Sequence, residues 1–265
     1  MGKKLANAPV YYTVIQIQFN QRLDLDRFVP DIQPKMRELH FPDFKKQVVQ
    51  RFDLPVMLTA DGQIAPPTVT AFTRYMFADI AGNTAFILDS NSLVLLTTAY
   101  DNFNVFLDTY LQGLDIIHKA LQIDLTEKIG IRYLDAVQPA GTTETLADYL
   151  IPQVLGMSLH GHGQLQHAFS ETTIATETGH LVSRVVVRNG PIGLPVDLTE
   201  TPLQSIHPRF TSYQGIHAII DTDAYTSKRE AFDLQRITQQ LTALHGEITT
   251  SFNAMVTDHA RAVWA

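Results

Sequence analysis

The sequence of 265 residues contains no cysteine. This absence excludes thiol nucleophiles, disulfides, cysteine-ligated zinc and iron–sulfur clusters. It also favours the cytoplasm, where disulfides are not available to stabilise a fold. No run of about 18 consecutive apolar residues occurs, and the early apolar segment 10–19 is interrupted by Gln16 and Gln18. We therefore expect no transmembrane segment and no secretory signal.

The sequence also lacks the short motifs that mark several enzyme classes. It has no glycine-rich phosphate loop, no dinucleotide-binding glycine motif after a strand, no HExxH zinc motif and no GxSxG nucleophile elbow. Because thiols are excluded as well, histidine and carboxylate sites are the remaining options for catalysis. The sequence thus leans against an enzyme, and it indicates no cofactor.

Basic side chains are scarce in the middle of the chain. The net charge is −7, and residues 61–180 contain only 4 basic side chains against 13 acidic ones. A nucleic-acid partner requires several cations to neutralise phosphates, so this segment argues against one and fits a basic protein partner better. A basic face could still form near the N-terminus, where we interpret the residues as a solvated helix end. These residues are Arg37, Lys45, Lys46 and Arg51.

The first half of the chain predicts a strand, a broken helix, a meander, a helix and a strand. Residues 10–19 alternate between two faces, as in a strand with one buried side. Residues 24–51 are typical of helical pieces separated by Pro30, Pro34 and Pro42. The other elements expected here are a loop at 55–68, an antiparallel meander of three strands at 70–99, a helix at 101–123 capped by Asp101, and a strand at 128–137.

The second half repeats the order of strands before a long helix, which indicates a pseudo-repeat. From Lys228 onward, apolar residues recur at three- and four-residue spacing, as in a long helix lying on a sheet. Before it we expect a short helix at 144–150, a hairpin of 164–177 and 180–188 around Thr178-Gly179, a long loop or edge segment at 190–214 and a strand at 216–223.

These elements predict an α+β fold, because single strands and helices do not alternate as a parallel sheet requires. An antiparallel sheet should be packed by the central helix and by the long C-terminal helix. The two halves, 1–138 and 139–265, should form one continuous structural unit. The C-terminal helix or an exposed edge of the sheet could also support a homodimer.

Histidines gather at His160, His162 and His167. On an extended strand the first two point to one side and His167 to the other, because successive side chains alternate. Three ligands from this segment therefore do not converge, although the intervening glycines permit an irregular loop. A two-histidine metal site completed from elsewhere is one interpretation. Polar histidines at the entry to a strand are the other, and we favour it.

A second candidate site lies on the strand at 216–223. His217, Asp221 and Asp223 share one face, and two carboxylates two residues apart could hold Mg²⁺ or Mn²⁺. The same charges could instead end a buried strand or cap the following helix. With His160 and His162, these residues define an alternative function, that of a metal-dependent hydrolase or nuclease.

The third candidate is Arg132, which stands in an otherwise apolar strand. Arg132 and Leu134 share one face of this strand, and Tyr133 and Asp135 share the other. Arginine is rarely buried without a partner, so Arg132 should meet an internal carboxylate or a bound anion. Arg74 stands similarly in the meander and could join the same polar layer. A small-ligand or nucleotide sensor that uses Arg132, Tyr133, Asp135 and Arg74 is therefore a second alternative.

Several segments together resemble one prokaryotic protein family. It is sporadically distributed and has no established biochemical function. The resemblance implies an accessory gene, such as one of a defence or toxin-neutralising system, and assigns no catalytic residue. Asn is commoner in the family where this chain has Asp135. The similar segments are LANAPVYYTVIQIQF, TRYMFAD, LVLLTTAYDNFNVFLD, IGIRYLDAV, IIDTDAY and VTDHARAVWA.

Together, these features predict a cytoplasmic protein without catalytic activity. We expect it to serve a bacterial accessory system by binding a protein partner.

Overall fold

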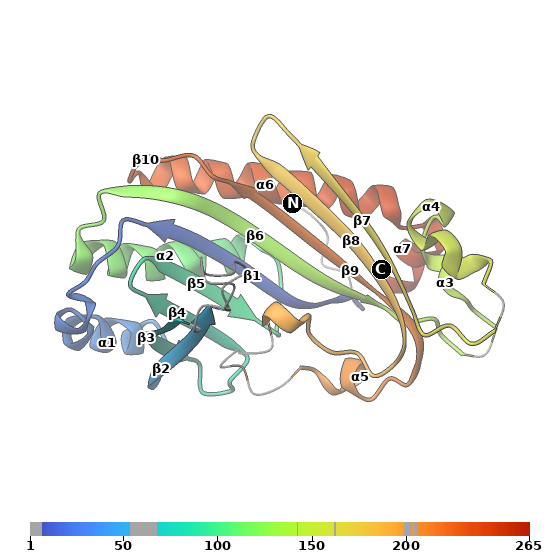
Figure 1. Cartoon of the computed structure of the whole chain (residues 1–265), viewed down its shortest axis with the longest axis horizontal. Coiled ribbons are helices and arrows are strands. Elements are labelled where there is room, and N and C mark those ends of the chain that lie inside the picture. Colours follow the sequence, from blue (N-terminus) through green and yellow to red (C-terminus); the bar gives the residue numbers. More distant parts are fainter. Residues whose placement is uncertain (1–6, 54–67, 142, 162, 199–202, 204–205) are drawn as a thin grey trace, which may run out of the picture.

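The computed structural model describes residues 7–53, 68–141, 143–161, 163–198, 203 and 206–265. In these ranges ten strands form one antiparallel sheet (Figure 1), with β1 (Val10–Phe19) and β6 (Leu125–Val137) side by side at its centre. On the side of β1 the sheet continues with β5 (Ser92–Thr97), β4 (Thr84–Asp89), β3 (Thr68–Ala78) and the edge strand β2 (Asp43–Asp53). On the side of β6 it continues with β9 (Gly215–Thr226), β8 (His180–Gly190) and the edge strand β7 (His167–Ala175). The short strand β10 (Glu230–Ala231) also pairs with β6.

The two halves of this sheet follow the same path. Each begins on a central strand, passes through a helical segment, returns as a meander from the edge towards the centre, and ends in a long helix. In this order β6 begins the second half, whereas a division at residue 138 places it in the first. The helical elements are α1 (Val29–Glu38) and α2 (Phe103–Leu121) in the first half, and α3 (Leu146–Tyr149), α4 (Pro152–Leu155) and α6 (Leu234–Met255) in the second.

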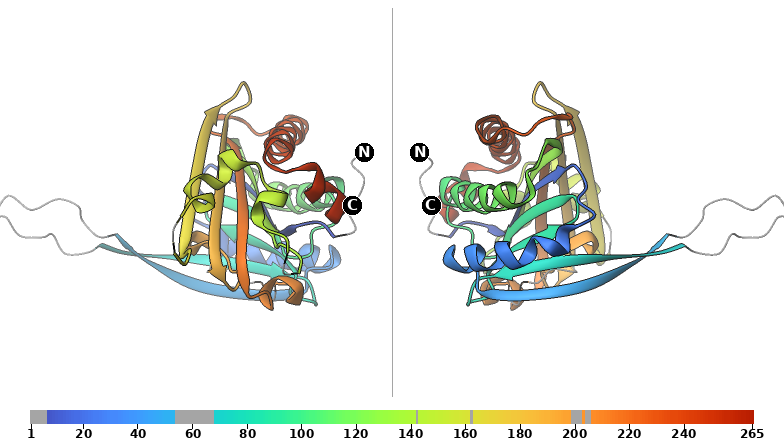
Figure 2. Two further views of the ribbon diagram at one scale, coloured as in Figure 1. Left: turned by 90° about the vertical axis from the view of Figure 1, so that its right-hand side faces the viewer. Right: turned by 90° about the vertical axis from the view of Figure 1, so that its left-hand side faces the viewer.

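The helices cover one face of the sheet, as Figure 2 shows for α2 and α6 beside the strands β7, β8 and β9. The apolar side of α2 is buried against the sheet, as its spacing predicts. The helix begins one residue later than expected: Asn102, not Asp101, is its N-cap, and its side chain accepts a hydrogen bond of 3.1 Å from the amide of Val105.

The C-terminal helix α6 lies on the sheet, which confirms the expected packing. Asp233 caps it by accepting a hydrogen bond of 2.8 Å from the amide of Arg236, and the helix passes through Gly246 without interruption. It ends at Met255, and α7 (Asp258–Trp264) follows. Within the described residues no helix is long and apolar enough to cross a membrane. The buried row of α6 consists of Ile237, Leu241, Leu244, Ile248 and Met255.

The opposite face of the sheet is covered by chain without long helices, as the expected loop at 190–214 implies. We call residues 191–198 the strap; it ends in the turn η3 (Val196–Leu198), and α5 (Pro208–Thr211) follows farther on. Ile192 of the strap and Phe210 of α5 are buried in an apolar cluster on this face. The hydroxyl of Tyr11 on β1 donates a hydrogen bond of 2.8 Å to the carbonyl of Gly193, which fixes the strap to the sheet.

The prediction of helical pieces as far as residue 51 is wrong beyond Glu38. The turn η1 (Leu25–Arg27) and α1 are helical, but 43–53 forms β2, paired with β3 along its whole length. Its cross-strand hydrogen bonds outweigh the weak helical pattern. Lys45 and Lys46 therefore lie on an edge strand, not at a helix end, and pair with Asp43 at 3.0 Å and Asp26 at 3.1 Å. The loop expected at 55–68 lies almost entirely outside the described residues.

Candidate functional site

Arg132 of β6 forms a bidentate ion pair with Asp221 of the neighbouring strand β9. Its Nε and Nη2 atoms donate to the two carboxylate oxygens, each at 2.7 Å. The pair lies on the face opposite the helices, because Arg132 shares that face with Leu134, as its position in the strand predicts. The third donor, Nη1, meets the carboxylate of Asp197 in the strap at 2.5 Å. Arg132 therefore bonds two carboxylates from two parts of the chain.

The network continues across the sheet through Arg184 of β8. Arg184 stands directly opposite Asp221 in the strand register, and its Nη1 atom lies 3.6 Å from that carboxylate. The Nε atom of the same guanidinium donates to Glu171 of β7 at 2.6 Å. Acidic and basic side chains thus alternate from the strap to the edge strand, in the order Asp197, Arg132, Asp221, Arg184 and Glu171.

The ion pairs hold Arg132 and Asp197 in their charged forms. Burial alone would lower the pKa of Arg132, but its bonds to Asp221 and Asp197 raise it above the ordinary value. Burial would raise the pKa of Asp197, but the hydrogen bond from Arg132 and the attraction of its charge together outweigh burial and lower this pKa. Asp223, whose side chain makes no hydrogen bond or ion pair within the described ranges, has a pKa raised by burial.

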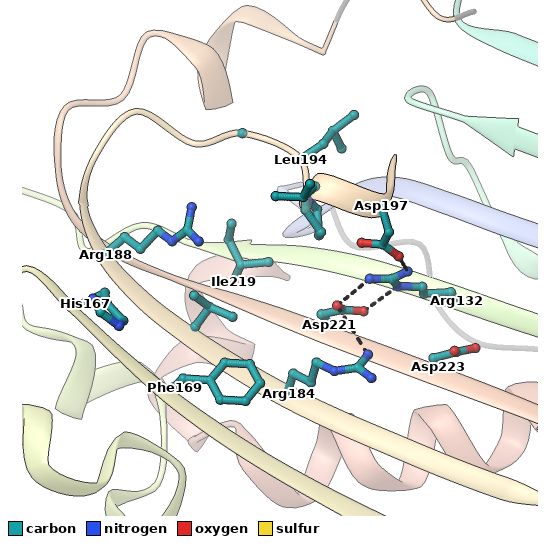
Figure 3. A pocket seen from close by; sticks show the side chains of 14 residues that line it. Arg132, His167, Phe169, Arg184, Arg188, Leu194, Asp197, Ile219, Asp221 and Asp223 are labelled. Carbon is teal, nitrogen blue, oxygen red and sulfur yellow. Dashed lines mark hydrogen bonds and ion pairs between the residues drawn. The ribbon is translucent and has the colours of Figure 1, made fainter. Parts of the chain in front are cut away.

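A pocket of about 580 Å³ lies beside this network (Figure 3). Strands β6, β9, β8 and β7 form its floor, and the strap forms one wall. Phe169 and Ile219 supply apolar lining, while Arg188 and His167 supply polar groups at the end away from Arg132. The pocket thus joins an apolar floor to several cationic groups.

The two ends of this pocket differ in charge. Arg188 is exposed and has no acidic partner among the described residues, and His167 lies opposite it in the register of β7 and β8. Asp223 lines the other end. It lies six residues along β9 from His217, the residue opposite Arg188, which is about 20 Å at the rise of a strand. The pocket is therefore elongated, with a cationic end and a mixed end.

Of the proposed metal ligands of β9, Asp221 and one ring nitrogen of His217 are already engaged. His217, Asp221 and Asp223 share one face as expected, but Arg132 and Arg184 hold Asp221, and the Nδ1 atom of His217 lies 3.1 Å from the carbonyl of Gly215. Burial lowers the pKa of His217. In the described ranges no group of three histidine, aspartate or glutamate side chains could hold a metal ion. The geometry therefore does not favour the metal-dependent alternative.

The histidine-rich segment does not form a site with β9. His160 is exposed just after the turn η2 (Gly156–Leu159), and His162 lies outside the described residues. His167, for which the sequence suggested no partner, begins β7 and lines the pocket. Its position there depends on the pairing of β7 with β8, which the local sequence does not specify.

The expected polar layer of Arg74 with Arg132 is wrong. Arg74 of β3 forms a bidentate pair with Asp89 of β4, at 3.0 and 3.1 Å, and several strands separate it from Arg132. Tyr133 and Asp135 point to the helix-covered face, as alternation predicts, and so cannot share a ligand with Arg132. Arg132 also faces away from the helices, so an anion site between sheet and helix is excluded for it.

A row of hydroxyl side chains crosses the helix-covered face at the level of Tyr133. Each residue of the row is the register partner of the next, on seven successive strands, and the row separates the two apolar clusters on this face. The hydroxyls of Thr13 and Thr222, on either side of Tyr133, are buried without a partner in the described ranges. The row consists of Thr84, Thr97, Thr13, Tyr133, Thr222, Ser183 and Thr172.

Tyr133 connects this row to α6. Its hydroxyl lies 3.1 Å from that of Tyr100 and 3.2 Å from Nδ1 of His245, whose ring stacks on Phe103. Burial lowers the pKa of His245 to about 4. The neighbouring Asp135 is only 7% exposed, and burial raises its pKa to about 7. These titratable groups are therefore interior groups, not part of the pocket.

Sequence reasoning did not identify Arg184, Arg188 and Asp197 as pocket residues. Arg184 and Arg188 are four residues apart in the alternating segment SRVVVR, which places both on one face of a strand. That spacing could have indicated a cationic face. Asp197 stands in an irregular loop, and no local pattern predicts its contact with a residue 65 positions away.

No protein-family model and no curated protein sequence matches the chain.

Proposed function

We propose that the protein binds an anionic ligand, without catalysis, in the pocket between the strap and strands β7, β8 and β9. The observation that carries this proposal is the guanidinium of Arg188, which lies beside His167 at the cationic end of the pocket. Guanidinium groups bind carboxylates and phosphates through two parallel hydrogen bonds. A guanidinium that lines a pocket without an acidic partner in the described ranges is ready to accept such a group.

The lining also supports a binding role over a catalytic one. Asp221, the most buried carboxylate of the pocket, is held by two arginines and is not available as a base or nucleophile. Phe169 and Ile219 can contact the apolar part of a ligand. Small-molecule sites usually combine such apolar lining with a few polar groups that orient the ligand.

Calorimetric titration tests this proposal. We expect wild-type protein to bind inorganic pyrophosphate, citrate or both, and the comparison of the two tells a phosphate site from a carboxylate site. Arg188→Met should weaken the binding about tenfold or more, because a hydrogen bond between charged groups is lost. Arg229→Met, which removes an exposed guanidinium 3.9 Å from Glu127, is the matched control and should bind as the wild type does. Equal binding by both variants would contradict the proposal.

A second proposal concerns the homodimer that the sequence allows: a second copy of the chain, paired at β7. This edge strand is exposed along most of its length, pairs with β8 without a bulge, and contains neither proline nor lysine. Such an edge is a template for another strand, whereas the edge strand β2 carries Lys45 and Lys46. Light scattering should detect a dimer that Ile174→Lys dissociates; a monomeric wild type would exclude this pairing.

A further inference from the structure

One edge of the Arg132 guanidinium is bound to a buried carboxylate, and the other edge is bound to a carboxylate that another anion can replace. Asp221 fixes the first edge through Nε and Nη2, and its side chain is only 4% exposed. The third donor, Nη1, bonds to Asp197, whose side chain is 62% exposed. A buried bidentate bond is costly to break, whereas an ion pair with a largely exposed carboxylate contributes little to stability. The contact with Asp197 can therefore be exchanged for another anion at little cost.

Asp197 is the exposed residue of a turn that is attached to the sheet. Its neighbour Leu198 packs against the apolar cluster on this face, whereas the side chain of Asp197 is largely exposed. The strap is also fixed earlier, where Gly193 accepts the hydrogen bond from Tyr11. A rotation of the Asp197 side chain would therefore free Nη1 of Arg132 without detaching the strap.

Arg132 and Asp197 also line the same pocket as Arg188. We propose that Arg132 is a second anion subsite, and that the carboxylate of Asp197 is an internal substitute for a ligand's phosphate or carboxylate. The natural ligand is then elongated, with one anionic group at Arg188 and another that displaces Asp197. This inference extends the proposed anion pocket, but its subsite can be tested separately from the one at Arg188.

The stoichiometry of pyrophosphate binding, measured by calorimetry on the full chain, tests both subsites. Wild-type protein should bind one pyrophosphate at Arg188. Asp197→Asn should bind two, because the freed edge of Arg132 accepts a second anion. Asp223→Asn removes the same charge from the same pocket but no bond to Arg132, so it should still bind one. The double variant Asp197→Asn, Arg188→Met should return to one.

Each failure has a distinct signature. One pyrophosphate in both wild type and Asp197→Asn overturns the subsite at Arg132 and leaves the proposed function standing. If wild type binds no pyrophosphate and Asp197→Asn binds one, the site at Arg188 is overturned and the displacement of Asp197 from Arg132 is supported. None in either overturns both. If Asp223→Asn and Asp197→Asn each bind two pyrophosphates, the loss of negative charge alone creates the second site. That result overturns the role of Asp197 as a substitute ligand.

Discussion

Arg132 and Asp221 lie on adjacent strands and are joined by two parallel hydrogen bonds of 2.7 Å, with Asp221 almost fully buried. Removing one partner of such a pair leaves a buried charge, which costs about 3–5 kcal/mol. Arg184 also approaches this carboxylate, at 3.6 Å, so we expect Arg132→Met to lower the free energy of unfolding towards the low end of that range.

Urea denaturation measures this loss. Arg261→Met, which breaks the exposed pair of Arg261 with Asp258, is the control and should cost less than about 1 kcal/mol. If the two variants lost equal stability, the pair of Arg132 with Asp221 would not be an internal structural contact.

Asp135 should make the protein less stable at neutral pH than in mild acid. Burial raises its pKa from 3.8 to about 7 in the folded chain, so folding favours the protonated form. Stability contributed by the neutral carboxyl is therefore lost as the pH rises from about 4 to about 7. Asp135→Asn should remove this loss and stabilise the fold at pH 8, by a few kcal/mol at most.

The measurement is the melting temperature of Asp135→Asn relative to wild type at pH 5 and at pH 8. Asp108→Asn on α2 alters an exposed carboxylate and should show no comparable difference between the two pH values. A variant destabilised at pH 8 would show that the charged form of Asp135 has a favourable partner.

His245 should make the fold less stable as the pH falls. Burial lowers its pKa from 6.5 to about 4, so the folded chain favours the neutral ring, and stability is lost as the pH falls from about 6.5 to about 4. His245→Gln should lose stability less steeply over this interval. The test compares unfolding free energies at pH 6.5 and 4.5, with His160→Gln, an exposed histidine, as the control. If the free energy of unfolding fell equally steeply with pH in the two variants, His245 would not be the cause of the acid destabilisation.

The hydroxyl row provides a matched pair of threonines. The hydroxyl of Thr222 is buried without a partner in the described ranges, whereas that of Thr97 lies 2.9 Å from the hydroxyl of Thr84 and accepts from the amide of Ala99 at 3.1 Å. Replacing an unpaired buried hydroxyl by a methyl group should stabilise the fold by about 1 kcal/mol, and replacing a paired one should destabilise it similarly.

Denaturation should therefore show that Thr222→Val raises the free energy of unfolding and that Thr97→Val lowers it. Destabilisation of both would indicate that a buried water satisfies Thr222.

The parts of the fold that the sequence predicted are those encoded by local patterns. Alternation in β1, turn residues in the meander and the apolar spacing of α6 each specify an element through its own residues. The segment that became β2 was mistaken for a helix because its structure depends on pairing with β3. Local proline spacing carries no information about that pairing.

Of the candidate site, the sequence predicted the role of Arg132 and named Asp221 and Asp223 only as metal ligands. An arginine in an apolar strand indicates a carboxylate or an anion, and Arg132 meets Asp221 as the first alternative requires. Alternation also placed Tyr133 and Asp135 on the other face. The partners from the strap and from β8 depend on strand order and on an irregular loop, so neither Asp197 nor Arg188 could be assigned from sequence.

The central claim is that Arg188 binds an anion, and the most direct measurement is the NMR signal of its side-chain Nε–H group during titration with pyrophosphate. The signal is assigned by its absence in Arg188→Met. Our account predicts that the Arg188 signal shifts in a saturable manner while that of Arg229 does not move. An Arg188 signal that remains unchanged at high pyrophosphate concentration would contradict it.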